Sequence, residues 1–321
     1  MDVLLEWRDV CREFSVRRGL FDPRSVRVKA VDGVSLSLLP GETLGLVGES
    51  GCGKSTLARM TMGLLPPTSG EIRLEERPLF SWTALERARR IQMVFQDPFS
   101  SLDPRQSVGA SIGEPIHLAA ATEGRPLSRA ELRKRVDELL GQVGLLPEHA
   151  ERYPHEFSGG QRQRVAVARA LGPAPRVLVC DEPVSALDAS VQAQVLNLLK
   201  DVQESRGLSY LFISHDLGVI GFMSDRVAVM YLGRIVELAP REELFAHAAH
   251  PYARALLESA PSRERRGAGR LLSGEMPSPL APPPGCAFHP RCPQARALCR
   301  EIPPPEITLS DQRFVRCHFP L

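Results

Sequence analysis

The stretch Gly48-Glu-Ser-Gly-Cys-Gly-Lys-Ser-Thr56 decides how this chain folds. It fits the pattern Gly, four residues, Gly-Lys-Ser/Thr without a mismatch, and it lies between an apolar run, Glu42 to Val47, and a helical pattern, Lys54 to Leu64. Glycines let backbone N–H groups converge on a phosphate, and the helix that follows adds a partial positive charge at its N-terminus. The stretch therefore predicts a phosphate-binding loop between a buried strand and a helix.

This loop predicts that the chain is an ATPase that uses magnesium-bound nucleotide. Lys54 is expected to reach the β- and γ-phosphates, and Ser55 to hold Mg²⁺. A glycine-rich turn with an unrelated lysine is the alternative, and the flanking strand and helix argue against it. The candidate nucleotide-binding residues of the loop are Gly48, Glu49, Ser50, Gly51, Cys52, Gly53, Lys54, Ser55 and Thr56.

A second pattern, Val177-Leu-Val-Cys-Asp-Glu-Pro183, ends an apolar strand with two carboxylates. Charges at the end of a buried strand are costly unless something binds them. Mg²⁺ on the β- and γ-phosphates would account for Asp181, while Glu182 could orient and deprotonate the attacking water. An acidic pair that merely caps the next helix is the alternative. The phosphate loop favours the catalytic interpretation.

Composition excludes several classes of protein. The chain has 321 residues and 43% hydrophobic content, enough for a full core and about two domains. Its 40 basic residues nearly cancel its 38 acidic ones, so no nucleic-acid partner is expected. It shows neither a signal pattern at its start nor an apolar run of about 18 residues. We expect it to stay in the cytosol and to reach a membrane only through a partner.

Periodicity predicts an α/β fold with a parallel sheet flanked by helices. Two strands at the start, Val3 to Phe14 and Val26 to Leu38, predict an antiparallel sheet, with a connection around Gly19 to Arg24. A helical insertion is expected from Ser107 to Leu146, with Ser128 as its cap and Glu131 as the partner of that cap. The other expected elements are a helix from Gly159 to Leu171, a strand from Val177 to Cys180, a helix from Val191 to Glu204, a strand from Tyr210 to Ile213 and a hairpin from Arg226 to Leu238.

The run Phe157-Ser-Gly-Gly-Gln161 opens a helix and could be an ordinary cap. Together with the phosphate loop and Asp181-Glu182, however, it resembles the signature of ABC-type ATPases. The same resemblance covers Gln96 as the glutamine loop, Asp188 as the end of the D-loop, and His215 as the switch histidine. The signature residues are Ser158, Gly159, Gly160 and Gln161.

The resemblance implies a RecA-like core and a head-to-tail dimer, in which the signature of one subunit contacts the γ-phosphate on the loop of the other. It implies that Gln96 ligates Mg²⁺ together with Ser55 and Asp181, and that His215 contacts the γ-phosphate. An aromatic residue near the N-terminus stacks on adenine in this family. Phe14 is the best match, and Phe21 is the alternative.

Some segments resemble a narrower group than the ABC-type ATPases as a whole. Ala30 to Ser35, Phe95 to Arg105 and the tail from His250 are similar to the oligopeptide/dipeptide importer ATPases, specifically the second of their paired ATPase subunits. This implies a related second ATPase, two transmembrane permease subunits, an extracytoplasmic solute-binding protein, and a peripheral place on the cytoplasmic face of the membrane. Dipeptides, longer peptides, glutathione, nickel complexes and murein peptides remain possible cargoes. A soluble ABC ATPase that acts on DNA or ribosomes is the competing class.

These patterns divide the chain into an ATPase domain, residues 1–250, with a helical subdomain at about 96–165, and a C-terminal extension, residues 251–321. After about Ser262 the composition turns rich in Arg, Gly and Pro, which suits a linker.

Four cysteines follow this linker, separated by five, six and seventeen residues: Cys286, Cys292, Cys299 and Cys317. The spacing is wider than that of typical zinc-binding pairs. We expect a [4Fe–4S] cluster that staples the extension, in line with the family resemblance; zinc, disulfides and free thiols are the alternatives.

Overall fold

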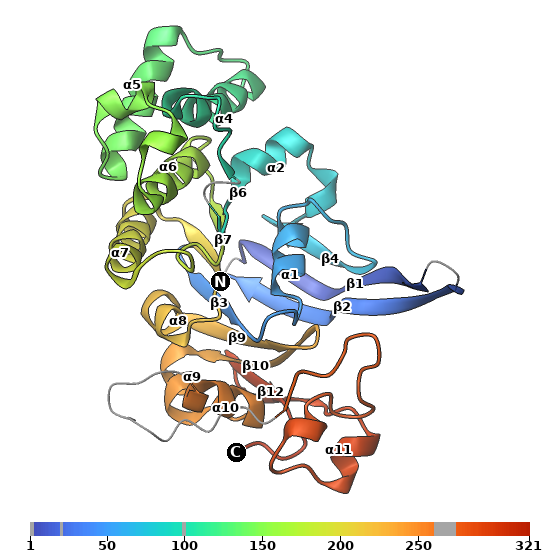
Figure 1. Cartoon of the computed structure of the whole chain (residues 1–321). Helices are drawn as coiled ribbons and strands as arrows, with labels where there is room; N and C mark the ends of the chain where they lie inside the picture. Colours follow the sequence, from blue (N-terminus) through green and yellow to red (C-terminus); the bar gives the residue numbers. More distant parts are fainter. Residues whose placement is uncertain (1–2, 20–21, 98–100, 260–273) are drawn as a thin grey trace.

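The computed structural model describes residues 3–19, 22–97, 101–259 and 274–321, and its main sheet has eight strands in the order β11-β12-β10-β9-β3-β8-β7-β6 (Figure 1). From β9 to β6 the neighbouring strands are parallel, which confirms the predicted parallel sheet. The strands are β3 (Thr43–Val47), β6 (Ile91–Val94), β7 (Val177–Asp181), β8 (Ser209–Ile213), β9 (Arg226–Tyr231), β10 (Arg234–Pro240), β11 (Glu306–Ser310) and β12 (Arg313–Arg316).

The central strands are short apolar runs because both of their faces are covered. Every residue of β3 and of β8 is buried. A parallel strand with helices on both faces has no solvent side, so its sequence does not alternate between apolar and polar residues. These strands therefore form the centre of the core. The loops that carry the candidate site follow their carboxyl ends.

A second, antiparallel sheet has the order β2-β1-β4-β5 and confirms the predicted N-terminal subdomain. The expected connection around Gly19 to Arg24 is wrong in extent, because pairing continues to Gly19 on one strand and resumes at Asp22 on the other. The strands are β1 (Leu5–Gly19), β2 (Asp22–Leu38), β4 (Ser69–Leu74) and β5 (Arg77–Pro78).

The helical insertion forms a lobe at one end of the main sheet (Figure 1). The predicted cap is confirmed: Ser128 accepts a hydrogen bond from the Glu131 N–H, and the Glu131 carboxylate accepts one from the Ser128 N–H. The elements of the lobe are α4 (Val108–Thr122), α5 (Arg129–Gln142), η2 (Pro147–Glu151), η3 (Pro154–Glu156) and α6 (Gly159–Leu171).

Apart from α7, the remaining helices before residue 260 are short; the last of them, α10, begins the C-terminal extension. No helix among the described residues is long and apolar enough to cross a membrane. These helices are α1 (Lys54–Thr61), η1 (Leu79–Ser81), α2 (Ala84–Arg90), α7 (Ala189–Arg206), α8 (Leu217–Met223), α9 (Arg241–His247) and α10 (Pro251–Ser259).

The C-terminal extension joins the main sheet, which its composition does not predict. Strand β12 pairs antiparallel with β10, with Glu237 opposite Val315 and Leu238 opposite Phe314. The 3-10 turn η4 (His289–Arg291) and the short helix α11 (Ala297–Glu301) precede this hairpin. The end of the chain is thus part of the same layer that carries the phosphate loop (Figure 1).

Candidate nucleotide-binding site

The predicted loop leaves the carboxyl end of β3 and enters α1. At Gly53, φ is +115°, and an added Cβ would lie 2.2 Å from the Ala30 carbonyl oxygen. At Gly48 an added Cβ would lie 2.2 Å from the Met230 carbonyl oxygen. Only glycine fits these two positions, because backbone from β2 and from β9 closes around the loop. The neighbouring strands therefore fix the loop's shape.

Lys54 is buried at the start of α1, and its ammonium group points back into the loop. Its Nζ donates hydrogen bonds to the carbonyl oxygens of Gly48, at 2.7 Å, and Glu49, at 3.0 Å. The charge is thus held at the centre of the loop, where the phosphates of a nucleotide would supply stronger acceptors. Ser50, Gly51 and Ser55 are exposed at the same place.

Strands β7 and β8 bring Asp181, Glu182 and His215 together, although they are far apart in sequence. Asp181 pairs in register with Ile213, and the Glu182 N–H donates to the Ile213 carbonyl oxygen at 2.9 Å. Nδ1 of His215 lies 3.2 Å from Oε2 of Glu182. The carboxyl ends of parallel strands meet at one edge of a sheet, which is where ligands bind in α/β folds. The structure therefore assembles three of the predicted site residues.

Glu182 adopts a left-handed backbone conformation, with φ of +50°. A non-glycine residue rarely occupies this region, and such positions occur often at active sites. The conformation turns the chain sharply after β7.

Asp181 faces the phosphate loop: Oγ of Ser55 donates to its Oδ1 at 3.4 Å. Burial raises the pKa of Asp181, the Ser55 hydrogen bond opposes this rise, and the charge of Glu182 adds to it. A divalent cation delivered with the nucleotide would reverse the rise, because it stabilises the carboxylate. The serine and aspartate oxygens are the ligand type that Mg²⁺ prefers.

The signature residues begin α6, and their local contacts are those of a helix cap. Ser158 accepts a hydrogen bond from the Gln161 N–H, and the Gln161 side chain accepts one from the Ser158 N–H. Among the residues that the structure describes, no hydrogen bond or ion pair joins this segment to the phosphate loop. Gly160 packs against α7, because an added Cβ would lie 2.2 Å from Cγ1 of Val191. The described contacts of this segment are therefore those of its own helix cap and of α7.

Asp188 caps α7 by accepting a hydrogen bond from the Val191 N–H at 3.0 Å. Gln96 is exposed and follows β6, where Gln163 donates to the Phe95 carbonyl oxygen at 3.3 Å. Asp188 therefore lies at the start of α7. Gln96 follows a residue whose carbonyl oxygen is bonded to α6.

Phe14 lies on β1, with 37% of its surface exposed and the Arg12 guanidinium 4.9 Å from its ring centroid. An exposed ring on this hairpin is available for stacking. The alternative, Phe21, lies outside the described residues.

Sequence reasoning missed a set of contacts that the extension makes with the phosphate loop. Arg291 donates two hydrogen bonds to the Glu49 carboxylate, at 2.6 and 3.0 Å. The Glu49 N–H donates to the hydroxyl of Tyr252 on α10, at 3.0 Å. Arg291 carries no recognisable motif beyond its place before Cys292, so the sequence alone could not assign it.

The four late cysteines line one small cavity, of about 10 Å³, and all of them are free thiols. The predicted disulfide alternative is therefore absent among these residues. No described group of three or more His, Cys, Asp or Glu side chains has the arrangement of a metal site. The donor set suits thiolate ligation, but the metal staple expected from the sequence is not shown. The cavity has room for about one water molecule, so a cluster would require the thiols to move apart.

Burial raises the pKa of Cys317 to about 11, and the neighbouring thiols add to this. The Cys317 thiol therefore stays protonated near neutral pH unless a cation binds it.

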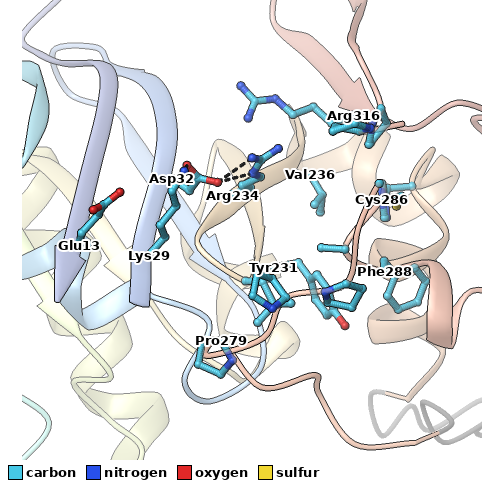
Figure 2. A pocket seen from close by; sticks show the side chains of 18 of the residues that line it. Glu13, Lys29, Asp32, Tyr231, Arg234, Val236, Pro279, Cys286, Phe288 and Arg316 are labelled. Atoms are coloured by element: carbon cyan, nitrogen blue, oxygen red, sulfur yellow. Dashed lines mark hydrogen bonds and ion pairs between the residues drawn. The ribbon is translucent and has the colours of Figure 1, made fainter. Parts of the chain in front are cut away.

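A larger cavity, of about 460 Å³, separates the extension from the N-terminal hairpin. Figure 2 shows Glu13, Lys29 and Asp32 on the hairpin side, Arg234 and Tyr231 beside them, and the extension opposite. Asp32 and Arg234 form an ion pair at 2.7 Å. None of the predicted loop, signature or catalytic residues lines this cavity.

Comparison with known proteins agrees with this geometry. A family model described as ABC transporter matches residues 31–185, and one described as oligopeptide/dipeptide transporter, C-terminal region, matches residues 236–299. The chain is 50% identical to the oligopeptide transport ATP-binding protein AppF of Bacillus subtilis (strain 168), over 99% of this chain and 97% of that protein. It is 48% identical to the di/tripeptide transport ATP-binding protein DppF of Pseudomonas aeruginosa (strain UCBPP-PA14), over 99% and 98%.

A solved dimeric structure of the ATP-binding cassette MJ0796, bound to ADP and Pi, has a TM-score of 0.64 and 27% identity to the chain. The match covers 74% of this chain and 98% of that one.

Proposed function

The chain belongs to the family of ATP-binding proteins of ABC transporters, in the branch that carries the oligopeptide/dipeptide C-terminal region, and from this we propose that it hydrolyses ATP to drive the import of peptides. The observation that carries the chemistry is the position of Glu182 and His215 at the edge of the sheet where Ser55 and Asp181 meet. The peptide cargo is inferred from the names of relatives that match along nearly their whole length.

In the proposed reaction, Glu182 accepts a proton from the attacking water and His215 contacts the γ-phosphate. Lys54 exchanges its loop carbonyls for β- and γ-phosphate oxygens. Ser55, Asp181 and Gln96 would hold Mg²⁺, which would supply positive charge next to the transferred group. Phe14 stacks on adenine.

We infer that the working unit is a head-to-tail dimer of ATPases. Within the described part of the chain, the Ser158–Gln161 segment forms no hydrogen bond or ion pair with the phosphate loop, which is expected if it completes the site of a partner. Asp188 would lie at the same interface. Closure on ATP and separation after hydrolysis would move two attached permease subunits, with an extracytoplasmic binding protein delivering the cargo. The chain would then lie at the cytoplasmic face of the membrane, held there by the permeases.

The test is reconstitution of the chain with its copurifying membrane subunits in vesicles. We expect uptake of a labelled di- or oligopeptide that requires ATP and the binding protein, and loss of uptake with Glu182→Gln. Uptake of nickel complexes, glutathione or murein peptides instead would contradict the proposed peptide cargo. It would leave the proposal of ATP-driven import intact. Copurification with ribosomes or DNA, without membrane subunits, would contradict the transport function.

We also propose that the four cysteines hold a [4Fe–4S] cluster, with zinc as the alternative. Its support is that four free thiols line one cavity in a segment with few apolar residues to stabilise it. Anaerobically purified protein should contain iron and acid-labile sulfide in equal amounts. Colourless protein with one zinc ion would contradict the cluster.

A further inference from the structure

The extension places a buried cation against the phosphate loop. The Arg291 side chain is only 4% exposed, and it meets Glu49 in a two-bond fork with distances of 2.6 and 3.0 Å. Parallel bonds between a guanidinium and a carboxylate fix orientation as well as charge. A loop residue is thus held by a residue 242 positions further along the chain.

The ion pair between Arg291 and Glu49 compensates a negative charge within the phosphate loop. Glu49 directly follows Gly48 in the segment that would receive a polyphosphate, and its side chain is only 28% exposed. An unpaired anion at this point would repel the nucleotide, and partial burial weakens the screening that water would provide. Arg291 cancels this charge.

Two more contacts hold the same loop from the same side. Tyr252, which is also in the extension, accepts a hydrogen bond from the Glu49 N–H and packs in an aromatic cluster with Tyr231 and Phe288. Met276, also from the extension, would lie 3.5 Å from a Cβ added at Gly51. Two residues of the loop, Glu49 and Gly51, therefore face residues of the extension.

We propose that Arg291 is a positioning residue for nucleotide binding, which neutralises Glu49 and couples the folded extension to the phosphate loop. The inference rests on the proposed binding of ATP at this loop. It assigns the extension a role in the ATPase site itself. Coupling of this kind is reciprocal. The free energy by which bound ATP stabilises the folded extension must equal the free energy by which the folded extension favours ATP binding.

A charge-rescue experiment tests the proposal through the dissociation constant of a fluorescent ATP analogue with Mg²⁺. Arg291→Gln should weaken binding about tenfold, because it leaves Glu49 uncompensated beside the phosphates. Glu49→Gln should weaken binding by no more than about twofold, since it removes the repelling charge. The double variant should return to within about threefold of the wild type, because no unpaired charge remains.

Arg300→Gln is the matched control, since Arg300 is an exposed arginine of the same extension. It should leave the dissociation constant unchanged. Should Arg291→Gln fail to fold, Arg291→Lys takes its place. Lysine keeps the positive charge but cannot form the two parallel hydrogen bonds, so we expect the affinity for the ATP analogue to fall about threefold. A purely structural role predicts no rescue by Glu49→Gln.

Amide hydrogen exchange supplies a second readout. ATP should slow exchange at residues 286–292 in the wild type and not in Arg291→Gln. Wild-type affinity in Arg291→Gln, or a double variant as weak as that single variant, would overturn the proposal while leaving the transport function intact. A wild-type protein that binds no ATP would overturn both. A protein that binds ATP but transports no peptide would overturn only the transport function.

Discussion

Nδ1 of His215 lies 3.2 Å from Oε2 of Glu182, and the two residues reach each other across adjacent parallel strands. Glu182 is largely buried, whereas His215 is 61% exposed at the open edge of the site. In the reaction proposed above, the more buried carboxylate would act on water and the more exposed histidine would contact the γ-phosphate.

Glu182→Gln should retain ATP binding and lose hydrolysis by a factor of about 10² to 10⁴, because the amide cannot accept a proton from water. Analogue binding and phosphate release in the assembled complex measure the two effects separately. Asp216→Asn is a control in the next loop, since Asp216 caps α8. A turnover rate equal to that of the wild type would remove Glu182 from its proposed role.

His215→Ala should reduce turnover with little change in the dissociation constant of ATP, because the expected γ-phosphate contact matters most during the reaction. We compare it with His247→Ala, which replaces an exposed histidine at the end of α9. Both should melt at the same temperature as the wild type. Equal activity of the two variants would contradict the role of His215.

Gly160→Ala should destabilise the protein by about 1–3 kcal/mol, because the new methyl group overlaps Val191, whose β-branched side chain cannot rotate away easily. Val191→Ala in the same chain should recover most of this loss. Denaturant unfolding measures both free energies. Gly141→Ala is the control, since nothing lies within 4 Å of its added Cβ and it lies inside α5; that change should not destabilise. Failure of Val191→Ala to compensate would show that the overlap is not the cause.

Lowering the pH from 7 to 5 should reduce the free energy of unfolding by about 2 kcal/mol through His250. Burial lowers the pKa of His250 from 6.5 to about 3, and its Nδ1 accepts the Tyr252 N–H at 3.0 Å. Well above pH 6.5 the ring is neutral in both states, so its contribution is complete. As the pH falls toward 3, protons bind the unfolded chain first and stability declines.

His250→Asn, which keeps an acceptor for Tyr252, should flatten this slope, whereas His247→Ala should not. Urea unfolding at pH 7 and pH 5 provides the measurement. An unchanged slope in His250→Asn would assign the acid sensitivity to other groups.

The local elements could be read from sequence because each depends on residues close together in the chain. The helix Gly159–Leu171 has the predicted bounds, and the cap at Ser128 forms with its predicted partner. The strand bounds are less accurate at the N-terminal hairpin, where pairing with a neighbour extends β1 and β2 beyond their apolar patterns. Backbone pairing needs no side-chain pattern, so composition could not reveal it.

The candidate site was predicted only as separate motifs. Asp181, Glu182 and His215 each carry a recognisable context, but their meeting depends on β7 and β8 being neighbours. Arg291 had no such context, and neither did the pairing of β12 with β10. The proline-rich composition before the cysteines indicated a linker and gave no sign of the strands β11 and β12 that follow.

The sequence by itself determined the phosphate loop, the order of the motifs and the alternation of strands and helices, because steric fit and hydrophobic period act over a few residues. Only the tertiary structure decided that the extension closes against this loop, with Arg291 on Glu49 and Tyr252 on its N–H. Those contacts join residues more than 200 positions apart. Burial and charge pairing at such separations depend on how the layers pack, which no local pattern encodes.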